Sequence, residues 1–130
     1  MPALTPPLAE RLEHDSTALS VRDVAAYLQK QLGQRMAAHL AGLGDPKQIG
    51  RYIRDDGPEP SRTTERRLRE GYKVVRMIVE AYDAPTARAW LFGTNSRLDD
   101  QAPIEVLGEA STTEPLAAVV RAARQFASFA

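Results

Sequence analysis

Cysteine is absent from all 130 residues, which excludes disulfides, thiol nucleophiles and thiolate metal sites. The two histidines, His14 and His39, lie far apart and lack the His or carboxylate partners that a zinc site has at short spacing. No stretch approaches the roughly 20 apolar residues of a membrane span, and residues 1–12 lack the basic start and apolar run of a signal peptide. We therefore expect a cytoplasmic chain with no membrane segment, no metal and no other cofactor.

A catalytic constellation is missing as well, because no nucleophile stands in a recognisable pattern with a general base. Asp99 and Asp100 form a carboxylate pair, but adjacent residues on a loop point in different directions and are usually solvated. Asp55 and Asp56 are better explained by the end of a helix. We therefore expect that the protein is not an enzyme.

The formal net charge is zero, yet the charges are unevenly distributed. Residues 46–76 hold nine basic side chains against five acidic ones, a balance of plus four, so the rest of the chain carries minus four. The basic residues of this segment are Lys47, Arg51, Arg54, Arg62, Arg66, Arg67, Arg69, Lys73 and Arg76. Such a surplus fits a face for nucleic acid, although a solvated Arg-rich helix would give the same pattern.

The hydrophobic periodicity predicts an all-α fold with a central helix-turn-helix, a long helix and a small C-terminal helical subdomain. Residues 1–19 contain three prolines and are expected to form a flexible N-terminal arm. Residues 20–82 are assigned to the helix-turn-helix region and residues 83–130 to the C-terminal region. Cap and turn signals place helices from Ser20 to Leu32, over 34–41 and 46–54, over 62–82, over 85–92, from Pro103 to Leu107, and after Thr112 or Thr113.

Two short helices joined at Gly42 are what a helix-turn-helix requires. Ala38 is small where the helices approach, and Ile49, Tyr52 and Ile53 would anchor the second helix to the core. In that arrangement the candidate DNA-binding residues are Lys47, Gln48, Arg51, Arg54 and Arg62.

Each candidate has a role that follows from its side chain. Gln48 can pair bidentately with adenine and Arg51 with guanine, whereas Lys47 and Arg54 suit phosphates. Arg62, at the start of the long helix, could add a backbone contact. The alternative is an exposed helix whose polar residues face water.

The stretch from Ala89 to Leu107 resembles the toxin-binding domain of Xre/MbcA/ParS-like antitoxins. The matching elements are Trp90, Leu91, Asn95, Leu98, Pro103, Ile104 and Leu107. Residues 32–43 and 66–69 also resemble the Xre-like helix-turn-helix region of that family. The resemblance implies a type II antitoxin that forms dimers, binds the operator of its own operon, and blocks a toxin of the RES fold, which destroys NAD.

The C-terminal region offers apolar side chains for a partner or a second copy of the chain. We predict that this interface contains Leu98, Ile104, Val119, Val120, Phe126 and Phe129. Dimerisation is favoured because a two-fold operator requires a two-fold protein, whereas Trp90 is interpreted as a core residue. Two alternatives remain: a solitary regulator without a toxin, and a protein-binding module that has lost DNA binding.

The start of the second short helix separates the DNA-binding and protein-binding interpretations. DNA binding is favoured if Lys47, Gln48 and Arg51 face outward together. The protein-binding module is favoured if they pair with Asp or Glu.

Overall fold

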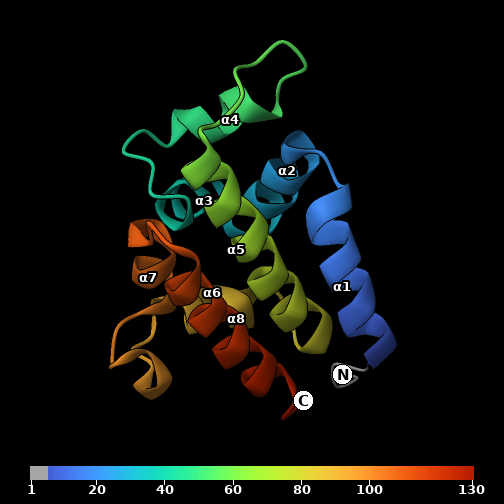
Figure 1. The fold of residues 1–130 in the computed structure, drawn as a ribbon, viewed down its shortest axis with the longest axis vertical. Helices are drawn as coiled ribbons and strands as arrows, with labels where there is room; N and C mark the ends of the chain where they lie inside the picture. Colours follow the sequence, from blue (N-terminus) through green and yellow to red (C-terminus); the bar gives the residue numbers. More distant parts are fainter. Residues whose placement is uncertain (1–5) are drawn as a thin grey trace.

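The computed structural model describes residues 6–130, and within them eight α-helices and one 3₁₀ segment form without any strand (Figure 1). The prediction of an all-α fold is confirmed. The elements are α1 (Pro6–Ala18), α2 (Val21–Leu32), α3 (Gln34–Leu40), α4 (Lys47–Ile53), α5 (Arg62–Ala81), α6 (Ala84–Phe92), η1 (Ser96–Leu98), α7 (Pro103–Glu109) and α8 (Thr113–Ala127).

Short polar side chains begin three of the helices, as the sequence predicts. The backbone N–H of Asp23 donates to the hydroxyl of Ser20 before α2. The hydroxyl of Ser61 accepts in the same way before α5, and the carboxylate of Asp83 accepts before α6. Each bond satisfies a backbone amide that the first helical turn leaves unpaired.

Helix α5 is the central element, and it packs against α8, α2, α1 and α6. In Figure 1, α8 runs along one side of α5 and α1 along the other. Leu68, Tyr72, Val75 and Ile78 of α5 are buried, and they belong to one core that also includes buried residues of α2, α3, α7 and α8. The helix-turn-helix region and the C-terminal region therefore share a single core.

The prediction of a flexible arm over residues 1–19 is wrong for the part that the structure describes. Residues 6–18 form α1, in which Leu12 and Ser16 are buried against the rest of the chain. Pro6 and Pro7 occupy the first helical turn, where a missing N–H costs nothing. Local sequence signals do not reveal α1 because it is held by contacts with α5; residues 1–5 of the predicted arm lie outside the described residues.

The segment between α6 and α7 is a compact turn built on Asn95. Its backbone N–H donates to the carbonyl oxygen of Gln101 over 3.1 Å, and its side chain accepts from the N–H of Arg97 over 3.0 Å. Asp99 and Asp100 take left-handed backbone conformations, which aspartate tolerates better than most residues. The turn buries Leu98 beside α8.

Candidate nucleic-acid interface

Helices α3 and α4 contact one another, and α2 packs against both. The chain turns between them at Gly42, which has a positive φ of 73°. The N–H of Leu43 closes the turn by donating to the carbonyl oxygen of Ala38 over 2.9 Å. Ala38, Ile49 and Tyr52 are buried, so the apolar faces predicted for the two short helices are confirmed.

The turn at Gly42 is pressed against α7. A Cβ atom at Gly42 would collide with the carbonyl oxygen of Gly108 and the guanidinium of Arg67. Nε2 of His39 lies 2.8 Å from Oε1 of Glu105, which adds an ion pair between α3 and α7 when the imidazole is protonated. Sequence reasoning gave His39 no partner, because Glu105 lies 66 residues further along the chain. These contacts fix the position of α3 relative to the C-terminal region.

Asp45 organises the start of α4. Its Oδ1 accepts the backbone N–H of Lys47 over 3.0 Å, and its Oδ2 lies 3.2 Å from Nη1 of Arg51. The backbone hydrogen bond from Lys47 is the main reason that the pKa of Asp45 lies below its usual value, and the nearby Arg51 adds to it. The same Nη1 donates to Oε1 of Gln48 over 2.7 Å.

The predicted DNA-binding residues therefore fall into two groups. Lys47, Gln48 and Arg51 come together at the start of α4, where Lys47 is exposed and the other two are half-exposed and bonded to each other. Arg54 ends α4 and Arg62 begins α5, and both are exposed. Within residues 6–130, no ion pair is formed by Lys47, Arg54 or Arg62.

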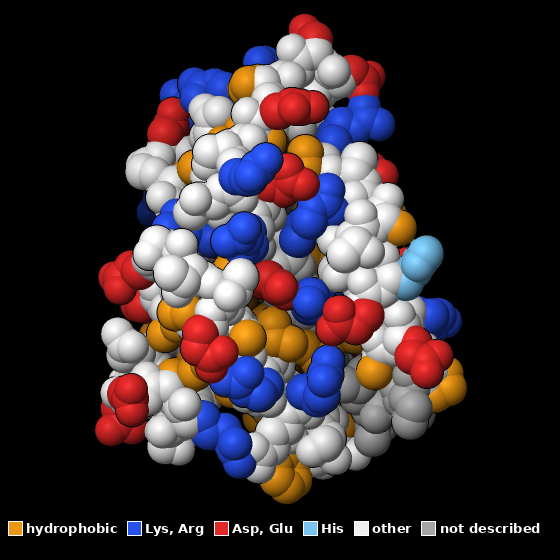
Figure 2. All heavy atoms as spheres, in the orientation of Figure 1, with side chains coloured by type: hydrophobic (Ala, Val, Ile, Leu, Met, Phe, Trp, Pro, Cys, Tyr) orange, Lys and Arg blue, Asp and Glu red, His pale blue; other side chains and the backbone are white. Residues whose placement is uncertain are grey.

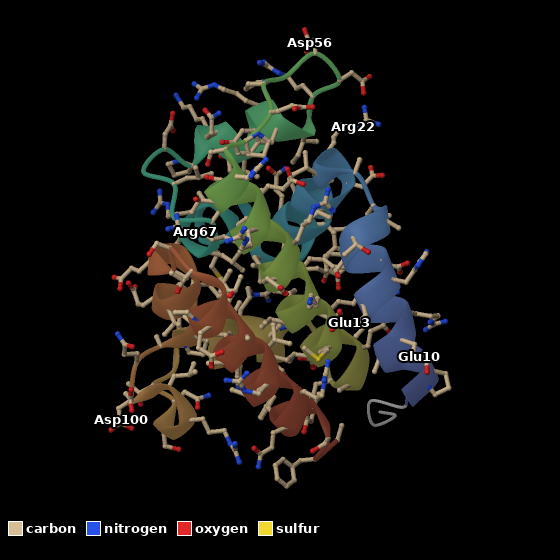
Figure 3. All side chains as sticks on the ribbon, viewed as in Figure 1. Glu10, Glu13, Arg22, Asp56, Arg67 and Asp100 are labelled. Carbon is tan, nitrogen blue, oxygen red and sulfur yellow. The ribbon has the colours of Figure 1, made fainter. Side chains whose placement is uncertain are left out.

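Four of the nine cations of residues 46–76 tie α5 to other helices. Arg67 donates to the carbonyl oxygens of Ala110 and Ala41 and thereby ties α5 to the ends of α7 and α3. The other three, Arg69, Lys73 and Arg76, contact α1. Much of the local positive surplus therefore holds helices together. Figure 3 shows Arg67 beside α7, away from α1.

The loop after α4 is tied to α2 by an ion pair between Arg22 and Asp55. Sequence reasoning assigned Asp55 to helix-ending chemistry and gave Arg22 no role. The loop residues Asp55, Gly57 and Glu59 line one wall of a cavity of about 460 Å³ beside the start of α2. The acidic residues of this loop reduce the positive charge next to Arg54.

The apolar interface predicted for the C-terminal region is largely wrong. Ile104 and Val119 are fully buried in the chain's own core, and Leu98 and Val120 are 6% and 8% exposed. Val119 and Val120 lie on the stripe of α8 that faces α5, and none of the four buried side chains is available to a partner.

Several aromatic residues of the C-terminal region keep part of their surface accessible. The ring of Phe126 lies 5.0 Å from that of Tyr82 and 6.0 Å from that of Trp90, measured between centroids. Phe129 is 74% exposed, and Phe92, which sequence reasoning missed, is 55% exposed. Of the six predicted interface residues, Phe126 and Phe129 keep accessible surface.

Within residues 6–130 no three His, Asp or Glu side chains converge in a way that could hold a metal ion. None of the helices in the same range has the length and apolar character needed to cross a bilayer. Compared with models of protein families, with curated proteins and with solved structures, the chain matches none at a significant level. The resemblance to Xre/MbcA/ParS-like antitoxins therefore rests on the motif residues alone.

Proposed function

We propose that this chain is a DNA-binding transcriptional regulator that acts as a type II antitoxin, represses its own operon and neutralises a RES-type toxin. The observation that carries the proposal is the pair α3 and α4, joined by the glycine turn and packed on α2. Such a pair can place the amino-terminal end of its second helix in the major groove of DNA. Lys47 and Gln48 begin α4, and the side chain of Arg51, from the last turn, reaches back to Asp45 and Gln48.

The toxin-binding half of the proposal rests on the resemblance of residues 89–107. Trp90 is half-buried, and Phe126, Phe129 and Phe92 offer aromatic surface of the kind that is enriched in protein interfaces. The dimer that a two-fold operator needs would use the same accessible residues, Phe126 and Phe129, because the other predicted interface residues are buried.

One observation favours the second candidate, a protein-binding module without DNA. Nη1 of Arg51 lies 3.2 Å from Oδ2 of Asp45, so the side chain that would bind guanine is held by a carboxylate in the turn before α4. An exposed ion pair of this kind is weak, because water and salt screen both charges. A phosphate or a guanine edge can replace such a contact, and we therefore rank DNA binding first.

Binding to the DNA upstream of the gene, measured over a range of salt concentrations, tests the proposal. The wild type should bind with a slope of several ions, and the double variant Lys47→Ala, Arg54→Ala should bind more weakly with a slope smaller by about two. Arg97→Ala is the matched control, because Arg97 is an exposed arginine on η1. Equal binding by all three proteins would exclude α4 as the DNA-binding element.

The toxin half needs its own assay. A RES-domain protein encoded beside the gene should deplete cellular NAD when it is expressed alone. Co-expression of this chain should protect the NAD pool, and Phe126→Ala with Phe129→Ala should reduce that protection. Unchanged NAD loss in the presence of the wild-type chain would exclude the antitoxin activity and leave a solitary regulator.

A further inference from the structure

Five cations repeat along one face of α5 at alternating spacings of four and three residues. They are Arg62, Arg66, Arg69, Lys73 and Arg76. This spacing places side chains in a single row along a helix. Figure 2 shows Lys and Arg side chains down the middle of the face where α5 runs between α1 and α8, with acidic side chains among them.

Helix α1 covers the end of this row that contains Arg69, Lys73 and Arg76, and the end at the start of α5 is open to solvent. Arg62 and Arg66 are exposed and form no ion pair with any residue in the range 6–130. A groove of about 420 Å³ joins the two ends, lined by Ser16, Thr17, Arg62, Arg66, Arg69 and Lys73 among others.

At the covered end, each cation has a partner on α5 and another on α1 or the turn that follows it. Arg69 pairs with Glu65 and donates to the carbonyl oxygens of Ser16 and Leu19 over 3.1 and 2.7 Å.

Lys73 and Arg76 repeat this arrangement with carboxylates of α1. Nζ of Lys73 lies 2.7 Å from Glu70 and 3.2 Å from Glu13. Nη1 of Arg76 lies 2.7 Å from Asp15, while its Nε lies 3.3 Å from Glu80. Helix α1 and the turn after it thus contact these cations through carboxylate and carbonyl oxygens. Phosphate oxygens could accept the same hydrogen bonds.

Apolar burial holds α1 only weakly. Among residues 7–18, Leu12 is the one large apolar side chain that is fully buried, and Leu8 is partly buried. The helix has no acidic residue in its first turn and no basic residue in its last, so nothing complements its dipole. A helix of 13 residues with these features is marginal without its contacts to α5.

We propose that α1 is a displaceable acidic cover, and that the cationic row beneath it binds the phosphate backbone of the DNA held by α4. This inference rests on the proposed function. DNA is favoured over an acidic protein because the open end of the row, at Arg62 and Arg66, begins α5 directly after the loop that leaves α4. A duplex seated on α4 and extending along α5 would exchange the carboxylates of Glu13 and Asp15 for phosphates.

Hydrogen exchange on the full-length chain tests the cover directly. Amides of residues 8–18 should exchange several-fold faster when a DNA duplex from the upstream region is added, while amides of α8 should be unchanged or slower. A duplex that binds yet leaves exchange in α1 unchanged would overturn the cover and leave the proposed function intact.

Two kinds of variant weaken the attachment of α1 and leave the residues of α5 unchanged. Glu13→Gln with Asp15→Asn removes its carboxylates, and Leu12→Ala loosens it with no change of charge. Both should tighten DNA binding several-fold at a fixed salt concentration, because displacing α1 then costs less of the binding free energy. Asp100→Asn with Glu114→Gln makes the same charge change at exposed sites on the loop after η1 and on α8, and it should tighten binding less than Glu13→Gln with Asp15→Asn does.

The outcomes separate the two proposals. DNA binding in which Leu12→Ala is no tighter than the wild type, and Glu13→Gln with Asp15→Asn is no tighter than its charge-matched control, would overturn the cover alone. No binding by any form at about 50 mM salt would overturn both. Faster exchange in α1 with polyglutamate but not with DNA would overturn the cover as a DNA device and indicate an acidic protein as the occupant.

Discussion

Helices α8 and α1 both lie along α5, but they are held by different forces. Helix α8 buries Leu116, Val119, Ala123 and Ala127, whereas α1 buries Leu12 and surrounds it with ion pairs to α5. Apolar burial is non-directional and little affected by salt, while the ion pairs of α1 with Lys73 and Arg76 are partly buried and are screened by salt in part. We infer that α8 stays packed against α5, whereas α1 can be displaced from it.

Leu116→Ala should give the largest effect, because it removes a side chain that is 2% exposed in the main core. We expect a loss of about 2–5 kcal/mol in the free energy of unfolding, measured by urea denaturation. The whole chain should unfold at the lower midpoint in one transition. A loss below about 1 kcal/mol would show that α8 is not part of the cooperative core.

Leu12→Ala is the matched change on α1, since Leu12 is also 2% exposed. The expected global loss is smaller than for Leu116→Ala, because the chain can release α1 and keep the rest of its core. Hydrogen exchange should show unprotected amides over residues 8–18 and protected ones in α5. If the two leucine variants lost equal stability, the difference between the two helices would disappear.

Salt should distinguish the two helices without any mutation. Raising the concentration from about 0.05 M to about 0.5 M shortens the Debye length to a few ångströms and weakens the pairs of Glu13 and Asp15 with α5. Amides in α1 should then exchange faster, and those in α8 should not. Equal responses in α1 and α8 would contradict the assignment of α1 to electrostatic attachment.

The smallest predicted effect concerns Asp45, where charge organises α4 as it does α1. Its pKa lies below the usual 3.8 because Lys47 and Arg51 bond the charged form. The resulting stabilisation is present above pH 3.8 and is lost as the pH falls through the lowered folded-state value. NMR titration of the Asp45 carboxyl should show a higher pKa in Arg51→Ala that still lies below 3.8, because the Lys47 bond remains. Identical titration curves would show that Arg51 does not interact with Asp45 in solution.

Local signals in the sequence were sufficient for most of the fold. Ser20, Ser61 and Asp83 cap helices where the sequence predicts, and the boundaries of α5 agree within one residue. Helix α1 could not be predicted because its partners, Lys73 and Arg76, lie about 60 residues away. Long-range charge pairs leave no periodic pattern in a single sequence.

The candidate sites were harder to predict than the helices. An amphipathic stripe shows that a face is buried, but it does not say whether the chain itself or a partner covers it. Val119 and Ile104 are therefore core residues despite the predicted interface. Arg51 illustrates the opposite problem, because its role depends on whether its pair with Asp45 gives way to DNA.

Mapping of DNA contacts by NMR is the most direct test of a DNA-binding role for α4. Upstream DNA is added to isotopically labelled full-length protein, and the shifted backbone amides are assigned. We expect the largest shifts at Lys47, Gln48 and Arg51 of α4, with little change in the loop from Asp99 to Gln101. Shifts confined to that loop or to the aromatic residues near Phe126, or none at all, would contradict a DNA-binding role for α4.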